Sequence, residues 1–301
     1  MASGKLMKVK DILGSNPLNK RHRGPHRKPR YRGRDLHEGG AMAGVGAIHI
    51  SEIEPTLRKL EKELGLNLRD FTLGSVGKKE FSGDIDIAIN LKPEELADFG
   101  KKLQAAPSTQ EVKKSSVFMT SVPIEGYDEN KTRDGLTRTG YVQIDFMPGD
   151  PGWMKTYYHA PHEKDSKYKG VFRNIMIASI AGRIDVVVGD EKIEDGRPLV
   201  QERWIWSPTD GLIRIKREPK PRKDGNGYTK AKVDTPISNP IRDPDGIAKQ
   251  LGLTSGKDLY SFETLLSALK KSYKGEKIKQ ILDDFRSNHA VQDIGVPDEI
   301  S

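Results

Sequence analysis

Residues 84–89 alternate isoleucine with acidic or small residues, in the order Asp-Ile-Asp-Ile-Ala-Ile. Alternate residues of a β-strand point to opposite faces, so the pattern predicts a strand with Ile85 and Ile87 in a core and Asp84 and Asp86 on the other face. Two carboxylates on one face lie about 7 Å apart and repel each other unless a cation neutralises them. The chain therefore needs a sheet with one buried apolar face, and a divalent cation on the other face would account for the two acids.

A second alternating stretch carries a third acid. Residues 141–147 read Tyr-Val-Gln-Ile-Asp-Phe-Met, which predicts a strand with Val142, Ile144 and Phe146 facing inward and Asp145 facing outward. If the two strands are neighbours, Asp145 completes a carboxylate triad. Such a triad could hold two Mg²⁺ ions about 3.5–4 Å apart, with Mn²⁺ as an alternative.

A glycine-containing turn precedes the first acids. Gly74-Ser75 follows a short predicted strand at 71–73, and Ser82-Gly83 directly precedes Asp84. A glycine turn exposes backbone N–H groups to an anion, and lysines add positive charge. Phosphate donors on one side and acids on the other would hold a nucleoside triphosphate for attack at its α-phosphorus. The predicted phosphate-binding residues are Gly74, Ser75, Lys78, Lys79, Ser82 and Gly83.

Helical periodicity supplies the layer that would cover such a sheet. The spacing predicts a helix over 51–64, capped by Ser51 with Glu54 as capping-box partner and ended by Gly65. Together the elements predict an α/β (α+β) fold, a mixed sheet backed by helices with a helical C-terminal region. The other predicted elements are strands at 116–124, 141–147 and 203–215, helices at 94–103, 168–181, 244–251, 261–273 and 276–287, and a basic loop at 216–234.

Positive charge is concentrated at the N-terminus. The formal net charge is +8, yet residues 1–34 hold 11 Lys and Arg and one acid, which leaves the remainder at −2. Such a segment cannot bury enough apolar surface to order itself, so residues 1–40 are predicted to be a flexible arm. We expect the arm to bind RNA or DNA phosphates, with a solubilising tail or charged linker as the alternative. The candidate nucleic-acid contacts are Arg21, Arg23, Arg27, Lys28, Arg30, Arg32 and Arg34.

Composition excludes several classes of protein. The chain has no cysteine, which removes disulfides, thiolate nucleophiles and Cys-ligated zinc or iron–sulfur sites. It also favours a reducing compartment, so we expect the cytoplasm, or the host cytoplasm if the chain is viral. No apolar run approaches a membrane span and no secretory signal is visible, so no membrane partner is expected. The oligomeric state is left open.

Taken in order, the motifs resemble one family. Gly-Ser, a short loop, Asp-x-Asp between apolar residues and a later Asp in an apolar strand resemble the DNA polymerase β nucleotidyltransferase superfamily. The stretch Glu80 to Asp86, Glu-x-Ser-Gly-Asp-x-Asp, is most similar to X-family polymerases. The resemblance covers roughly residues 51–215 and includes Tyr157-Tyr158 and Phe172-Arg173-Asn174.

The resemblance implies roles for particular residues. Asp84 and Asp86 would bind both metal ions, and Asp145 would bind the catalytic one and help activate the attacking hydroxyl. Ser75, Gly83 and Lys78 or Lys79 would hold the β- and γ-phosphates. Tyr158 and the helix that carries Arg173 would line the sugar and base.

The chain departs from the family in ways that leave the acceptor open. Eight residues separate Ser75 from Asp84, one fewer than is usual, and lysines replace the usual loop arginines. No DNA-clamping domain is recognisable upstream, nor an arginine-rich CCA-adding motif downstream. The expected enzyme transfers a nucleoside monophosphate from an NTP or dNTP to an acceptor hydroxyl, a nucleic-acid 3′ end being favoured. The alternatives are modification of a protein or small molecule, and a non-catalytic nucleic-acid-binding protein. The predicted division is an arm at 1–40, a catalytic core at 41–215, and a basic loop with a helical region at 216–301.

Overall fold

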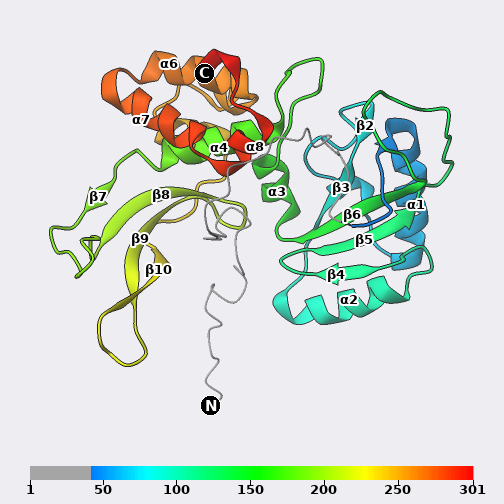
Figure 1. The fold of residues 1–301 in the computed structure, drawn as a ribbon, viewed down its shortest axis with the longest axis horizontal. Coiled ribbons are helices and arrows are strands. Elements are labelled where there is room, and N and C mark those ends of the chain that lie inside the picture. The colour runs from blue at the N-terminus through cyan, green and yellow to red at the C-terminus, as the bar shows by residue number, and fades with distance from the viewer. Residues whose placement is uncertain (1–41, 301) are drawn as a thin grey trace, which may run out of the picture. The chain divides into compact units, whose positions relative to one another are not determined.

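The chain divides into two compact units. The computed structural model describes residues 42–300, in which unit 1 extends up to Pro151 and unit 2 begins at Gly152 (Figure 1). The predicted arm, with its arginines and Lys28, lies outside the described residues. The division predicted between residues 215 and 216 instead falls inside a strand of unit 2, β9 (Gly211–Pro221). The fold is a mixed α/β fold, as the sequence predicts.

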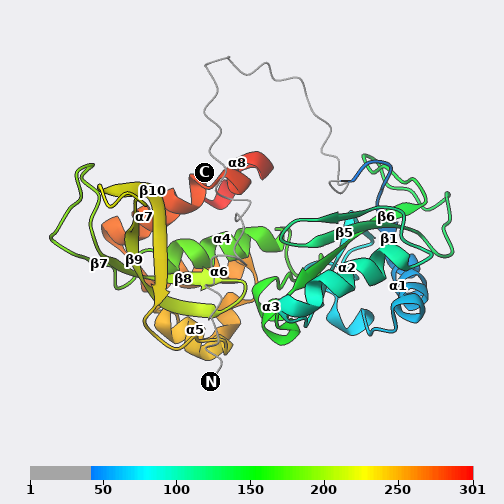
Figure 2. The ribbon, with the colours of Figure 1, turned by 90° about the horizontal axis from the view of Figure 1, so that it is seen from below.

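Unit 1 is a four-stranded mixed sheet covered on one face by helices. The strand order is β3-β6-β5-β4, in which β3 and β6 run parallel and the other two pairs antiparallel. Figure 2 shows the helices on one side of this sheet. A separate pair, β1 with β2, lies outside it. The elements are β1 (Ile48–His49), α1 (Ile50–Leu64), β2 (Phe81–Ser82), β3 (Asp84–Ile89), α2 (Leu96–Ala105), β4 (Val112–Lys114), β5 (Phe118–Pro123) and β6 (Tyr141–Pro148).

The core of unit 1 forms where the two predicted periodicities meet. Isoleucines of β3 and apolar residues of β5 and β6 pack against the apolar stripes of α1 and α2. The alternation in residues 84–89 is confirmed, because Ile85, Ile87 and Ile89 are buried while both acids remain partly exposed. The core of this unit contains Ile53, Leu57, Leu60, Leu64, Ile85, Ile87, Ile89, Phe99, Leu103, Phe118, Val122, Val142, Ile144 and Phe146.

Helix α1 begins differently from its prediction. The N-cap is His49, whose Nδ1 accepts from the Ser51 amide at 3.2 Å, and Glu52 rather than Glu54 closes the capping box. The helix therefore starts one residue early, and its end at Gly65 (φ +58°) is as predicted. The sequence rule looked for a serine oxygen, whereas the histidine ring nitrogen fills the same role.

Unit 2 combines an antiparallel sheet with helices. Its strand order is β10-β9-β8-β7, so consecutive strands form a meander. The predicted strand at 203–215 is in fact two strands joined by a tight turn, and most of the predicted basic loop at 216–234 is the paired end of the β9–β10 hairpin. The elements besides β9 are α3 (Pro151–Tyr157), α4 (Gly170–Ala181), β7 (Val187–Val188), β8 (Gln201–Ser207), β10 (Tyr228–Pro236), α5 (Pro244–Gln250), α6 (Phe262–Ser272), α7 (Gly275–Arg286) and α8 (His289–Ile294).

The helices of unit 2 surround a second core. Helix α4 contacts α6, α7 and β8, and the C-terminal helical region predicted from 244 onward is confirmed. All three tryptophans, Trp153, Trp204 and Trp206, are buried in this core, as expected of large apolar side chains. Among residues 42–300, no helix is long and apolar enough to cross a bilayer.

Candidate active site

Backbone register brings the three predicted acids together. Strands β3 and β6 are parallel neighbours, with Asp86 directly opposite Asp145 and Asp84 opposite Gln143. Residues in register on adjacent strands share a face, and the strands lie about 4.8 Å apart. Asp84, Asp86 and Asp145, here called the acid cluster, therefore share the face opposite the core. The condition that the sequence left open, that the two strands be neighbours, is met.

The acids raise one another's pKa. Burial is the main cause that raises the pKa of Asp86 to about 7, and the charges of Asp84 and Asp145 add to it. Burial also raises the pKa of Asp145 to about 6, against a hydrogen bond from Gln143 that lowers it, with the Asp84 charge raising it further. A carboxylate with these values prefers a proton or a cation as its neighbour.

The donor set suits a hard divalent cation, although the side chains do not form a cage. Mg²⁺ and Mn²⁺ favour carboxylate oxygens, and the acid cluster supplies three carboxylates on one face. Within residues 42–300, no group of three or more His, Cys, Asp or Glu side chains stands in a metal-coordinating arrangement. Binding of a cation would therefore require these carboxylates to turn toward one another.

A glutamine to which the sequence assigned no role orients Asp145. Gln143 is 2% exposed, and its Nε2 donates to Asp145 Oδ1 at 2.7 Å. Its Oε1 accepts from the backbone amide of Met42 at 3.0 Å, a contact across 101 residues of sequence. Because the Met42 backbone amide holds Oε1 of Gln143, the Nε2 end of this side chain faces Asp145. The outward position of Gln143 is readable from strand alternation, but its partner at Met42 is not.

The predicted glycine turn lies beside the acid cluster. A Cβ placed on Gly74 would lie 3.8 Å from Asp86 Oδ2, and the Leu73 amide donates to the Asp86 carbonyl at 2.9 Å. Gly74 and Gly77 have φ of +63° and +72°, a left-handed conformation that glycine adopts without strain. The strand predicted at 71–73 is wrong. Residues 69–71 form a 3₁₀ turn, and only Thr72 pairs, in a single bridge to Ile87.

The remaining predicted phosphate contacts follow this turn. Ser75, Lys78 and Lys79 are partly exposed, and the Lys78 amide donates to the Ser75 carbonyl at 3.0 Å. Ser82 is 5% exposed and its Oγ has no hydrogen-bond partner in the structure. A buried hydroxyl without a partner is uncommon and marks Ser82 as a group that a ligand could satisfy.

Tyr158 and Arg173 belong to unit 2. The Tyr158 ring meets Tyr157 edge to face at 4.8 Å. Arg173 is 3% exposed, its Nε donates to the Leu259 carbonyl and its Nη1 donates to the Tyr157 carbonyl at 3.2 Å. Burial lowers the pKa of Arg173 to about 10. These contacts give Arg173 a role in holding unit 2 together, and base binding by either residue stays a prediction.

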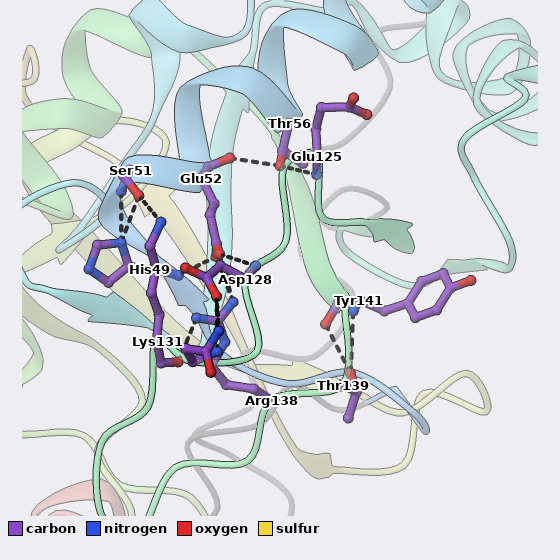
Figure 3. Close-up of polar contacts among 11 residues, drawn as sticks. His49, Ser51, Glu52, Thr56, Glu125, Asp128, Lys131, Arg138, Thr139 and Tyr141 are labelled. Atoms are coloured by element: carbon purple, nitrogen blue, oxygen red, sulfur yellow. Dashed lines mark hydrogen bonds and ion pairs between the residues drawn. The ribbon is translucent and has the colours of Figure 1, made fainter.

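A buried ion pair fixes the loop that leads into β6. Arg138 Nη2 donates to both carboxylate oxygens of Glu52, at 2.9 and 2.7 Å, and the two side chains are 5% and 2% exposed (Figure 3). Burial alone would raise the pKa of Glu52, but hydrogen bonds from Arg138 and from the Asp128 and His49 amides bring it below its usual value. Lys131 also donates to Ser51 at 2.8 Å. The 125–140 loop is thereby tied to α1 at several points.

Comparison with known proteins gives a limited likeness. No family model matches the chain, and neither does any curated protein sequence. Two solved structures of Leishmania infantum polymerase beta are similar to it in chain path, each at 14% identity. The ternary gap complex has a TM-score of 0.32, with 56% of this chain and 51% of that chain covered, which is about half of that chain's length. The ternary P/T complex has a TM-score of 0.33, with 78% and 76% covered. These values do not place the chain in a family.

Proposed function

We propose that the chain is a metal-dependent nucleotidyltransferase. It would move a nucleoside monophosphate from an NTP or dNTP to an acceptor hydroxyl, a nucleic-acid 3′ end, and release pyrophosphate. The observation that carries this proposal is the register of β3 and β6, in which Asp86 faces Asp145 across the strand pair with Asp84 on the same face and Gly74 beside it.

The proposed reaction uses the chain's own groups for positioning and proton transfer. The acceptor oxygen forms a bond to the α-phosphorus while the bond to the pyrophosphate oxygen breaks. The Asp145 carboxylate accepts the hydroxyl proton, and the Gln143 amide holds Asp145 Oδ1 in place. The glycine turn and Ser82 bind the triphosphate, with Lys78 and Lys79 neutralising the charge on the leaving pyrophosphate. Divalent cations, when bound to the acid cluster, supply charge stabilisation at the phosphates and at the attacking oxygen.

The test is direct transfer of label. The full chain is incubated with each α-labelled NTP and dNTP, Mg²⁺ or Mn²⁺, and a panel of tRNA, single-stranded RNA, primed DNA and cell lysate. We expect extension of a nucleic-acid 3′ end and release of pyrophosphate. Label on a protein or metabolite instead would favour the alternative acceptors, and no transfer to any acceptor would contradict the proposal.

Matched variants test whether transfer depends on the acid cluster in particular or on the loss of any acidic side chain. Asp84→Asn and Asp145→Asn should each lower transfer at least about 1,000-fold, as loss of a metal-binding or proton-accepting carboxylate does when the two-metal charge stabilisation is lost. Asp98→Asn serves as the control, because Asp98 is an exposed acid on α2 whose one ion pair among residues 42–300 is with Lys101 at 3.0 Å. Turnover near the wild-type rate in either cluster variant would refute the assignment.

A further inference from the structure

The distal half of the β9–β10 hairpin carries cations without acidic partners. Residues 216–232 contain seven Lys and Arg and two acids. Two of these cations are paired, Lys216 with Glu218 at 2.9 Å and Arg217 with Asp234 at 2.6 Å. The other five lie within 4 Å of no carboxylate in the described chain. They are Lys220, Arg222, Lys223, Lys230 and Lys232.

Register places two of these cations, Arg217 and Lys232, on one face of the sheet. Arg217 pairs with Gln201 on β8 and with Asp234 on β10, and Lys232 pairs with Pro219. Arg203 lies two residues from Gln201, so it shares the face of Arg217. Tyr228 is opposite Pro221, beyond a register shift, and lies on that face as well. We call Arg203, Arg217, Tyr228 and Lys232 the hairpin face.

The cations of the hairpin face crowd one another. Arg203 Nε is buried without a hydrogen-bond partner, and a Cβ on Gly182 at the end of α4 would lie 2.8 Å from Arg203 Nη2. Burial lowers the pKa of Arg203, and the charge of Arg217 lowers it further. The pKa of Lys232 is lowered by burial and then by Arg217, Arg203 and Arg197. Asp234, which pairs with Arg217 at 2.6 Å on the same face, raises the pKa of both Arg203 and Lys232 and offsets part of this repulsion. A bound anion would offset the rest.

The shape of the patch selects a polymeric anion. The cations are spread along the two strands of an antiparallel ribbon, of 11 and nine residues, and the turn that joins them. Figure 1 shows the path of this ribbon. Such a ribbon meets successive phosphates of a chain, and a tyrosine among lysines offers a ring on which a base can stack. A free phosphate or nucleotide would use only one or two of these groups.

We propose that the exposed, unpaired cations at the end of the β9–β10 hairpin, together with Tyr228, bind the sugar–phosphate backbone of a single-stranded nucleic acid. These cations are Lys220, Arg222, Lys223, Lys230 and Lys232. The proposal takes its choice of polyanion from the proposed function, but it requires no catalysis. It adds a contact surface in unit 2 to the arm predicted at residues 1–40.

The experiment measures binding without nucleotide or metal. Fluorescence anisotropy of a labelled 20-nucleotide RNA is recorded with the full-length chain in EDTA, from 50 to 300 mM KCl. The test variant combines Lys220→Gln, Lys223→Gln and Lys232→Gln, which break no ion pair. The matched control combines Lys62→Gln, Lys102→Gln and Lys249→Gln, three exposed lysines of α1, α2 and α5 that lie outside the basic segments.

Loss of three phosphate contacts has a defined signature. The slope of log Kd against log [KCl] should fall by about 2 in the test variant, because each contact with a single strand contributes about 0.7. The control should keep the wild-type slope. Tyr228→Ala should weaken binding about tenfold and Tyr228→Phe should not, since stacking on one base is worth about 1–3 kcal/mol.

Three outcomes would overturn the proposal. These are equal losses in the test and control variants, an unchanged slope in the test variant, or a loss confined to vesicles containing 30% phosphatidylserine while RNA binding persists. The Asp84→Asn chain separates this failure from failure of the proposed function. It should be inactive in transfer yet bind RNA with the full salt slope, so binding and catalysis are scored independently.

Discussion

At Asp86, burial and two neighbouring carboxylates both disfavour the ionised side chain. Its pKa is raised from 3.8 to about 7, so the folded chain binds a proton more tightly than the unfolded chain does. The folded state therefore holds the extra proton between these pH values, and its stability falls as the pH rises through that range. Above pH 7 the Asp86 carboxylate is ionised in the folded state, and the free energy of unfolding is lowered by its full burial and repulsion cost.

Removing that charge should stabilise the metal-free protein. Asp86→Asn is expected to raise the Tm of unit 1 by several degrees at pH 8 in EDTA, at about 2–8 °C per kcal/mol. The gain should shrink toward pH 4, where the wild-type carboxyl is protonated in the folded state and partly protonated in the unfolded state. Circular dichroism melts at pH 4, 6 and 8 test this, with Asp98→Asn as the exposed control. A gain that does not depend on pH would contradict the electrostatic cause.

Gln143 provides a second test at the scale of one side chain. Gln143→Glu keeps an acceptor for the Met42 amide but loses the donor to Asp145 and adds a negative charge beside it. Both changes raise the pKa of Asp145, so the acidic limb of the transfer rate should move to higher pH. Measurement of kcat/KM from pH 5 to 9 would detect the shift. Gln143→Leu, which adds no charge, should lower kcat about tenfold at the pH optimum. If Gln143→Glu lowers kcat but leaves the pH profile unchanged, the role of Gln143 is purely structural.

At the scale of elements, the glycine turn contains its own control. Gly74 and Gly77 both have positive φ, but a Cβ on Gly74 would face Asp86 Oδ2 at 3.8 Å while a Cβ on Gly77 meets nothing within 4 Å. Gly74→Ala and Gly77→Ala should therefore lose similar stability, about 1 kcal/mol each. Only Gly74→Ala should raise the KM for the nucleoside triphosphate. Urea unfolding measures the loss of stability and steady-state kinetics measure KM. Equal KM values for both variants would mean that the glycine turn does not contact the triphosphate.

Elements were predictable where one face of each is apolar. Strands β3 and β6 show period-two alternation and α1 shows a helical stripe, because each buries one face against the same core. The end of the β9–β10 hairpin has no such signal, since most residues of β10 are exposed on both faces. The Gln143 contact with Met42 spans 101 residues and follows from no local pattern. The three acids were predictable as a group, whereas the residues that position them were not.

At the scale of the molecule, positive charge is concentrated in a few segments of the chain. Outside residues 1–34 the chain carries a net charge of −2, so the basic hairpin end stands within a nearly neutral body. Residues 270–279, with five Lys and one Glu, also concentrate positive charge, so a polyanion would meet three basic segments, the arm, the hairpin and this one. Charge distribution of this kind favours defined contacts over general adhesion to nucleic acid.

Because the two units have separate cores, binding of a cation to one unit can be measured separately from the stability of the other. The acid cluster lies in unit 1, whereas all three tryptophans lie in the core of unit 2. A ligand that binds only the folded state raises stability by RT ln(1 + [L]/Kd), so 10 mM Mg²⁺ should raise the melting transition of unit 1. Circular dichroism reports both units and tryptophan fluorescence reports unit 2. We expect Mg²⁺ to shift the first signal and leave the second unchanged.

The pH dependence of that shift follows from the same acids. At pH 5.5 Asp86 and Asp145 are largely protonated, because their pKa values are about 7 and 6, and a cation must displace those protons to bind. The Mg²⁺-dependent shift in circular dichroism should therefore be larger at pH 8 than at pH 5.5, and Asp145→Asn should reduce it at both. An equal shift in tryptophan fluorescence would place the cation in unit 2 instead. An equal shift at both pH values would mean that the cation binds without displacing these protons, and the acid cluster would then not be its site.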